Sequence, residues 1–216
     1  MSTPSPSAAD YLRAMRCPVW VQPQTFGLWT IQRRRYDHEA FRLLVGHPYQ
    51  TALCRLTDAT MLSGGATVME DSTQELSRHL PILLAARGRV LVSGLGLGCV
   101  LRGLLANPAV RHVDVVEVDQ EIIDAIWPEF APDPRCMIHH GDALTCAWPP
   151  GTRWDFAWHD VWCEGDGQLH LLHLKLITRY RAMAEQQGAW QLPRLVKRVS
   201  SLPLVGASRS RSRRAA

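Results

Sequence analysis

Three glycines at alternate positions, Gly94, Gly96 and Gly98, constrain this chain more than any other feature of its sequence. An apolar run at 90–93, typical of a buried strand, comes directly before them, and a helical pattern at 97–106 overlaps their end. Glycine lets the backbone turn tightly and approach a ligand without a Cβ clash, and the N–H groups that open the next helix suit anionic atoms. This order predicts a nucleotide-binding unit.

The stretch that follows residue 88 alternates apolar runs with helical patterns. Strands are predicted at 90–93, 113–118, 136–139 and 154–158, and helices at 97–106, 121–127 and 167–187. Residues 189–196 are a candidate fifth strand. Because helical crossovers between strands produce parallel pairing, we predict a doubly wound, mainly parallel α/β sheet.

The chain before residue 88 has a different pattern. Short aromatic and β-branched runs at 26–31, 51–56 and 66–69 predict a small β-rich N-terminal lobe of three or four strands. A helix is predicted at 72–86, with Ser72 as its cap and Glu75 as the capping-box partner. Pro81 should kink this helix or split it in two.

Four regions are therefore expected. They are a disordered N-terminus at 1–18, the β-rich lobe at 19–71, the α/β domain at 72–200 and a disordered basic tail at 201–216. The tail carries the net charge: the last eight residues hold four arginines, and without them the 24 Lys and Arg fall to 20, equal to the 20 Asp and Glu. The tail alone suits nucleic acid or acidic partners, although a solvated end is the commoner role.

Composition also bounds location and metal chemistry. No apolar run reaches the ~18–20 residues that cross a bilayer, and the N-terminus does not resemble a secretory signal, so we expect a cytoplasmic protein without a membrane partner. Six scattered cysteines without a C-x-x-C pair argue against a disulfide framework or a thiolate zinc site. His170 and His173 have helical spacing, but with no third ligand we predict no metal site.

Acidic residues follow the second, third and fourth predicted strands. Glu117 lies about twenty residues after the glycines, where a carboxylate accepts hydrogen bonds from ribose hydroxyls, and Asp119 is placed to cap the next helix. Asp142 follows the third strand and suits the amino group of adenine. His159 and Asp160 end the fourth strand, at the edge where parallel sheets hold their sites.

The glycine loop and Glu117 alone also fit a dinucleotide dehydrogenase, with Cys99 in place of the last small residue of G-x-G-x-x-G/A. The acids after the third and fourth strands favour another family. Residues 88–162 resemble a class I methyltransferase domain of the spermidine synthase-like branch, through the loop, 116–119, 141–143 and the spacing from Asp155 to Asp160.

Two further motifs carry the same likeness. Residues 74–81 resemble the helix that precedes the sheet in aminopropyltransferases. Residues 158–162, with Arg179 and Tyr180 downstream, resemble a little-characterised group of bacterial and prophage methyltransferase-like proteins. The resemblance covers roughly residues 60–190.

The resemblance implies an S-adenosylmethionine site, or a site for its decarboxylated form. The resemblance implies the following roles: Gly94, Gly96 and Gly98 at the methionine part, Glu117 at the ribose, Asp142 at the adenine and Asp160 as proton acceptor. From its place beside Asp160, His159 is a candidate deputy base. Trp158 and Trp162 can wall the acceptor pocket by stacking, with core packing as the commoner role of tryptophan.

Two departures from the resemblance bear on the reaction. Leu97 stands where spermidine synthases carry an acid in the glycine loop, and no Asp-Gly-x-x-Gln segment is found upstream. We therefore expect methyl transfer to an unidentified small-molecule or nucleic-acid acceptor, with aminopropyl transfer to a polyamine as one alternative and a catalytically silent cofactor-binding module as another. Few residues remain after Gln187 for the usual last helix and hairpin, so the sheet is either abbreviated or ends in sequence foreign to the family.

Overall fold

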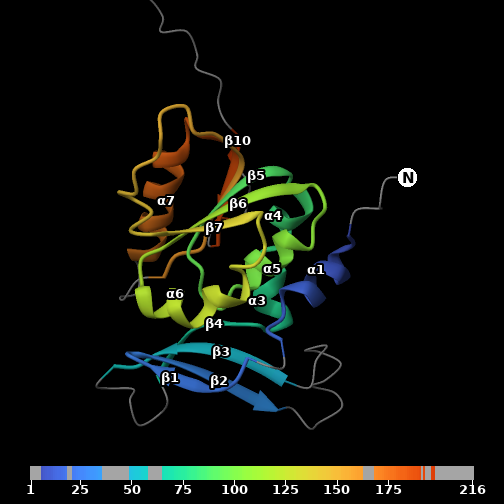
Figure 1. The fold of residues 1–216 in the computed structure, drawn as a ribbon, viewed down its shortest axis with the longest axis vertical. Helices are drawn as coiled ribbons and strands as arrows, with labels where there is room; N and C mark the ends of the chain where they lie inside the picture. Colours follow the sequence, from blue (N-terminus) through green and yellow to red (C-terminus); the bar gives the residue numbers. More distant parts are fainter. Residues whose placement is uncertain are drawn as a thin grey trace, which may run out of the picture.

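The computed structural model describes residues 6–18, 21–35, 49–57, 65–162, 168–190, 192 and 196–197. These residues form two sheets. A four-stranded antiparallel sheet lies across one end of a six-stranded, mainly parallel sheet that has helices on both faces (Figure 1). The doubly wound α/β fold and the β-rich N-terminal lobe expected from the sequence are both confirmed.

The six-stranded sheet has the order β10-β9-β8-β5-β6-β7. Its strands are β5 (Gly88–Ser93), β6 (Val110–Glu117), β7 (Cys136–His140), β8 (Trp154–His159), β9 (Ala184–Ala189) and β10 (Val196–Lys197). Strands β5 to β9 pair in parallel with their neighbours, and β10 pairs antiparallel with β9. The chain therefore starts in the middle of the sheet, builds outward to β7, and crosses back to β8, which creates a switch point between β5 and β8.

Helices cover the parallel sheet on two sides. They are α1 (Ala8–Met15), α3 (Thr73–Ser77), α4 (Leu80–Ala85), α5 (Cys99–Leu105), α6 (Gln120–Ile126), the 3₁₀ turn η2 (Trp127–Glu129) and α7 (Gln168–Tyr180). Apolar side chains of α1, α4, α5 and α6 join the larger core cluster. Leu176 and Tyr180 of α7 pack on the other face, against Leu91, Val116 and Trp154.

Local signals placed several of these elements correctly. The expected helix at 72–86 is split, because α3 ends at Ser77 and Pro81 lies in the first turn of α4. Ser72 Oγ accepts the Glu75 N–H at 3.2 Å, although the Glu75 side chain does not return to complete a capping box. Asp119 caps α6 by accepting the Glu121 N–H at 2.9 Å.

The expectation of a disordered N-terminus is wrong for residues 8–15. Helix α1 forms there because Ser7 and Asp10 make a reciprocal capping box, and because Tyr11 and Met15 are buried. Met15 packs beside Gly103 of α5, where an ideal Cβ would lie 2.8 Å from the Met15 side chain. Two apolar residues one turn apart were therefore enough to dock a Ser- and Pro-rich segment.

The last helix and the fifth strand also differ from the expectation. The helix predicted at 167–187 ends at Tyr180, and β9 occupies 184–189 in place of a strand at 189–196. The strand was hidden by its polar sequence, Glu185-Gln186-Gln187. Gln187 is buried nonetheless, because its amide donates to the Ile177 carbonyl at 2.8 Å and its oxygen lies 3.3 Å from His159 Nε2.

The antiparallel sheet has the order β1-β2-β3-β4. Its strands are β1 (Gln24–Phe26), β2 (Trp29–Arg35), β3 (Tyr49–Arg55) and β4 (Ala66–Glu70). The run at 26–31 is a hairpin rather than one strand, because Gly27 turns with a φ of 50°. Trp29 ties this sheet to the parallel one, since its Nε1 donates to Asp119 Oδ2 at 2.8 Å.

Several expectations concern other parts of the chain. Residues 201–216, with the basic tail, and Cys163 lie outside the described residues. The five described cysteines are free thiols. Among the helices that the structure describes, none is long and apolar enough to span a membrane.

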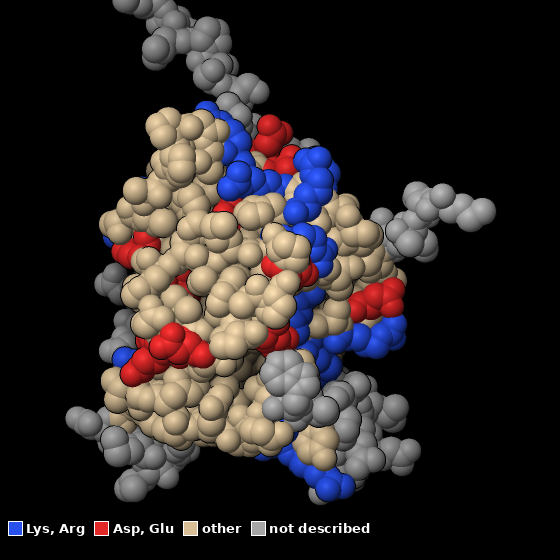
Figure 2. Space-filling view, viewed as in Figure 1, with Lys and Arg blue, Asp and Glu red and all other residues tan. Residues whose placement is uncertain are grey.

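On the face drawn in Figure 2, Lys and Arg form a band with Asp and Glu among them, and uncharged side chains cover most of the rest.

Asp114 is a buried carboxylate that holds the outer part of the parallel sheet together. It is 1% exposed and accepts hydrogen bonds from Trp154, His139, Arg89 and His112. Burial by itself raises the pKa of this carboxyl, but the four donors together outweigh burial and hold its pKa below the usual value. Its contribution to stability is therefore present above pH ~4 and is lost as the pH falls through the folded-state pKa.

The substitution Asp114→Asn should lower the free energy of unfolding by about 3 kcal/mol at pH 7, because it removes a buried charge that four donors share, one of them the buried indole of Trp154. Urea denaturation measures this change. The exposed Asp124→Asn is the matched control and should cost less than about 0.5 kcal/mol. Equal effects of the two substitutions would contradict the role given to Asp114.

Candidate functional site

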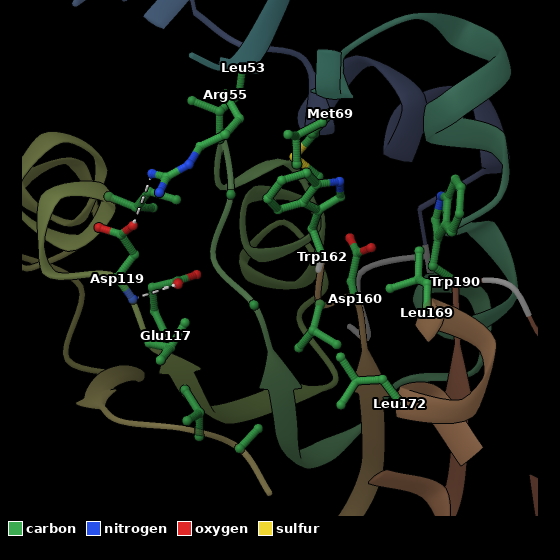
Figure 3. A pocket seen from close by; sticks show the side chains of 18 of the residues that line it. Leu53, Arg55, Met69, Glu117, Asp119, Asp160, Trp162, Leu169, Leu172 and Trp190 are labelled. Carbon is green, nitrogen blue, oxygen red and sulfur yellow. Dashed lines mark hydrogen bonds and ion pairs between the residues drawn. The ribbon is translucent and has the colours of Figure 1, made fainter. Parts of the chain in front are cut away.

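A cavity of about 660 Å³ lies between the two sheets, at the C-terminal ends of the parallel strands (Figure 3). The antiparallel sheet supplies Trp29, Leu53, Arg55, Thr67, Val68 and Met69, and the parallel sheet with its loops supplies Gly94, Gly96, Glu117, Asp119, Asp142, Asp160 and Trp162. Glu75, Trp190 and three leucines of α7 close the remaining side. Ligand sites of doubly wound sheets lie at this edge, beside the switch point.

The glycine loop forms the floor of the cavity, and packing inside the protein requires two of its glycines. An ideal Cβ on Gly94, where φ is 96°, would lie 2.0 Å from the carbonyl oxygen of Asp160. A Cβ on Gly98 would lie 2.5 Å from the Phe130 ring. Gly94 and Gly96 line the cavity as expected, but Gly98 begins α5 on the core side and does not reach it.

Glu117 lies at the end of β6 with its carboxylate on the cavity wall. The side chain is 6% exposed, and its two oxygens accept the Leu95 N–H at 2.8 Å and the Asp119 N–H at 3.0 Å. Burial raises the pKa of Glu117 against the opposing effect of these donors. Each carboxylate oxygen keeps a further lone pair for a ligand hydroxyl.

Asp142 and Asp119 flank Glu117 in different ways. Asp142 is exposed, lines the cavity and accepts the Leu144 N–H at 2.8 Å through one oxygen. Asp119 faces the antiparallel sheet, where it binds Trp29 and lies 3.9 Å from Arg55 (Figure 3). The sequence pattern placed Asp119 as a cap but gave no sign of this second role between the sheets.

Met69 was not singled out by the sequence, yet it covers the glycine loop. Its sulfur accepts the Leu97 N–H at 3.2 Å, and an ideal Cβ on Gly96 would lie 2.7 Å from that sulfur. A side chain from β4 of the N-terminal lobe therefore covers the turn, and this lobe forms part of the same site.

Asp160 follows β8 and projects into the cavity. In Figure 3 its carboxylate lies between the rings of Trp162 and Trp190. The side chain is 17% exposed, and burial raises the pKa of Asp160 to about 7. A carboxyl with this pKa changes protonation near neutral pH, as a general base requires.

The structure does not bring His159 and Trp158 to the cavity. His159 is fully buried beneath β5 and α7, with Nδ1 2.9 Å from Ser93 Oγ and Nε2 3.3 Å from the Gln187 oxygen. Burial lowers the pKa of His159 to about 3, and the side chain does not reach the cavity, so the structure does not place His159 where a deputy base would act. Strand side chains alternate, so His159 points to the face opposite Asp160, where its ring stacks on Tyr180. Trp158 lies on the other face and packs in the larger core cluster, against His79.

Trp162, the other expected wall, does line the cavity. It is 38% exposed and meets Trp29 edge to face, with ring centroids 6.1 Å apart. Three more residues of this region were not predicted to belong to the site: Glu75, His79 and Trp190. Trp190 Nε1 donates to Glu75 Oε1, and His79 Nε2 lies 3.8 Å from Asp160 Oδ2. Glu75 was predicted as a capping-box partner, and Glu75 and His79 fall in the stretch 74–81 that resembles aminopropyltransferases. Nothing near Trp190 indicated a pocket.

Within the ranges that the structure covers, no group of three or more His, Cys, Asp or Glu side chains is arranged to hold a metal ion.

Comparison with known proteins places the chain only broadly. No family profile matches it. A segment is 36% identical over 92 residues to the spermidine synthase of Coffea arabica, covering 38% of this chain and 29% of that protein. A segment is 41% identical over 56 residues to ribosomal RNA small subunit methyltransferase A of Parasynechococcus marenigrum (strain WH8102), covering 26% of this chain and 18% of that one. The matches thus span less than a third of each relative.

Solved structures give a looser likeness. The 23S rRNA methyltransferase ErmE superposes with a TM-score of 0.41 and 18% identity, over 51% of this chain and 43% of that one. The strand order itself matches the Rossmann-like class I methyltransferase fold, with its antiparallel last strand. The spermidine synthase-like branch is not established.

Gly94→Ala should lower the free energy of unfolding by about 2–4 kcal/mol, because it adds a left-handed strain and displaces the Asp160 carbonyl. Gly151→Ala is the matched control: φ there is 85°, but nothing lies within 4 Å of the added Cβ. It should cost only about 1 kcal/mol. Denaturant melts that give both variants the same loss would refute the close contact.

Proposed function

We propose that this chain is an S-adenosylmethionine-dependent methyltransferase that acts on a nitrogen nucleophile bound beside Asp160. One observation carries the proposal: the buried carboxylate of Glu117 and the partly buried carboxylate of Asp160 face a single cavity from the ends of two different strands of a doubly wound sheet. The methyltransferase relative over 26% of the chain supports methyl transfer as the reaction.

The residues present fit the cofactor. A cavity of about 660 Å³ lies within the ~300–1,000 Å³ usual for cofactor sites. The free lone pairs of Glu117 suit the two ribose hydroxyls, the loop at Gly94 and Gly96 suits the methionine part, and Asp142 suits the adenine amino group. Val118, Ile122 and Leu144 add apolar surface at the same end.

When bound, S-adenosylmethionine supplies a methyl group on a positively charged sulfur, ready for in-line displacement. The protein's part is positioning and the exclusion of water. Trp162 and Trp190 flank Asp160 and provide flat surfaces on which an amine or a base can stack (Figure 3). The Asp160 carboxylate accepts the proton that the nitrogen must lose and so directs its lone pair into the cavity.

Aminopropyl transfer to a polyamine is the second candidate. It is favoured by the spermidine synthase relative and by the presence of a second cavity carboxylate, Glu75, which would suit a diamine. Leu97 disfavours aminopropyl transfer, because spermidine synthases carry an acidic residue at this position of the glycine loop. Preference of the purified protein for decarboxylated S-adenosylmethionine over the parent compound would establish the second candidate.

Glu117→Gln should weaken S-adenosylmethionine binding about 10- to 100-fold. The amide keeps the size of the side chain but loses charge-assisted bonds to the ribose, worth about 1.5–3 kcal/mol. Isothermal titration calorimetry measures the affinity. Glu185→Gln, on the exposed side of β9, is the control and should bind like the wild type. Wild-type affinity in Glu117→Gln would remove Glu117 from the site.

Asp160→Asn should leave cofactor affinity within about threefold and lower turnover by ~10²–10⁴, the usual contribution of a general base. The assay follows labelled methyl transfer from S-adenosylmethionine to a pool of small amines and RNA. Because the base acts when ionised, wild-type turnover should rise as the pH increases through about 7 and then level off. Full turnover in Asp160→Asn, or a flat wild-type profile, would contradict the assignment.

A further inference from the structure

His79 lies behind the cavity and is the least expected side chain near it. It is 0% exposed, and within the described part of the chain neither ring nitrogen has a hydrogen-bond partner. Its ring meets Trp158 edge to face, with centroids 5.8 Å apart, which fixes its orientation in the core. Buried polar nitrogens are nearly always hydrogen-bonded, so an unpartnered imidazole points to a function beyond packing.

The charged groups around His79 are carboxylates on two sides and one arginine. Its Nε2 lies 3.8 Å from Asp160 Oδ2, across from β8. Glu75 precedes His79 by one helical turn. The Glu75 carboxylate accepts a hydrogen bond from Trp190 Nε1 and forms an ion pair with Arg78 at 2.9 Å. Asp160 and Glu75 line the cavity, so His79 can influence a ligand only through them.

We infer that His79 is a positioning residue that shares a proton with Asp160 and receives, through that carboxylate, the proton lost by the acceptor nitrogen. The inference rests on the proposed function. As the nitrogen lone pair forms the new N–C bond and the C–S electron pair returns to sulfur, the N–H proton moves to an oxygen of Asp160. A proton of that carboxyl then passes to Nε2 of His79, which leaves an imidazolium beside the restored carboxylate.

Burial determines whether the proton rests on Asp160 or on His79. It raises the pKa of Asp160 to about 7 and lowers the pKa of His79 to about 4, so the resting proton belongs on the carboxyl group. Burial also raises the pKa of Glu75. The imidazole becomes charged only in company with a carboxylate, because opposite charges this close stabilise each other in a poorly solvated site.

The test is an NMR titration of the full chain labelled at the Asp carboxyl carbons and His ring nitrogens. A shared proton requires the His79 ring nitrogens to shift through the same inflection, near pH 7, as the Asp160 carboxyl carbon. His79→Gln, which cannot hold the proton, should lower the Asp160 midpoint, by about 0.3 unit where the proton is shared equally, because the pair loses one of its two proton sites. The cofactor affinity of this variant should stay within about threefold of the wild type.

His173→Gln is the matched control, because His173 is equally buried and lies outside the cavity lining. It should leave the Asp160 midpoint unchanged. The inference is overturned if the chemical shifts of the His79 ring nitrogens in the wild type do not change across the pH range in which Asp160 titrates. This result does not depend on any variant folding. It is also overturned by equal shifts in the two glutamine variants. Failure of the wild type to bind S-adenosylmethionine would sink the proposed function, whatever the titration shows.

Discussion

The site depends on the close approach of the chain at Gly94 to the carbonyl of Asp160, where there is no room for a side chain. Gly94 follows β5, and the carbonyl of Asp160 at the end of β8 lies where its Cβ would be. The Asp160 N–H donates to Ser93 at 2.8 Å, and the Gly94 N–H donates to Val116 at 2.8 Å, so three strand ends are bound side by side. This contact brings the acid of β8 and the acid of β6 to the same cavity.

The electrostatics of the cavity follow from that geometry. Glu117, Glu75 and Asp160 all lose solvent at this edge, and burial raises the pKa of each one. Carboxyl groups that share an apolar cavity resist ionisation unless a positive charge joins them. A sulfonium group and a protonated amine are both cations, so the site is electrostatically suited to the cofactor and the acceptor class proposed for it.

The sequence predicted what depends on local signals. Glycines between a strand and a helix, and acids after successive strands, correctly placed Gly94, Glu117, Asp142 and Asp160 around one edge of the sheet. It could not predict contacts made by distant segments. His159 and Asp160 are adjacent, and only the pleat of β8 decides which one faces the cavity, while Met69 and Trp190 enter from β4 and β9, far along the chain.

The proposed function requires that this cavity bind S-adenosylmethionine. The most direct measurement is calorimetric titration of the purified full chain with S-adenosylmethionine, followed by its decarboxylated form. We expect saturable binding at one site per chain, with the parent compound binding at least as tightly as the decarboxylated one. No heat of binding with either compound, at concentrations up to about 1 mM where even weak cofactor sites fill, would contradict it.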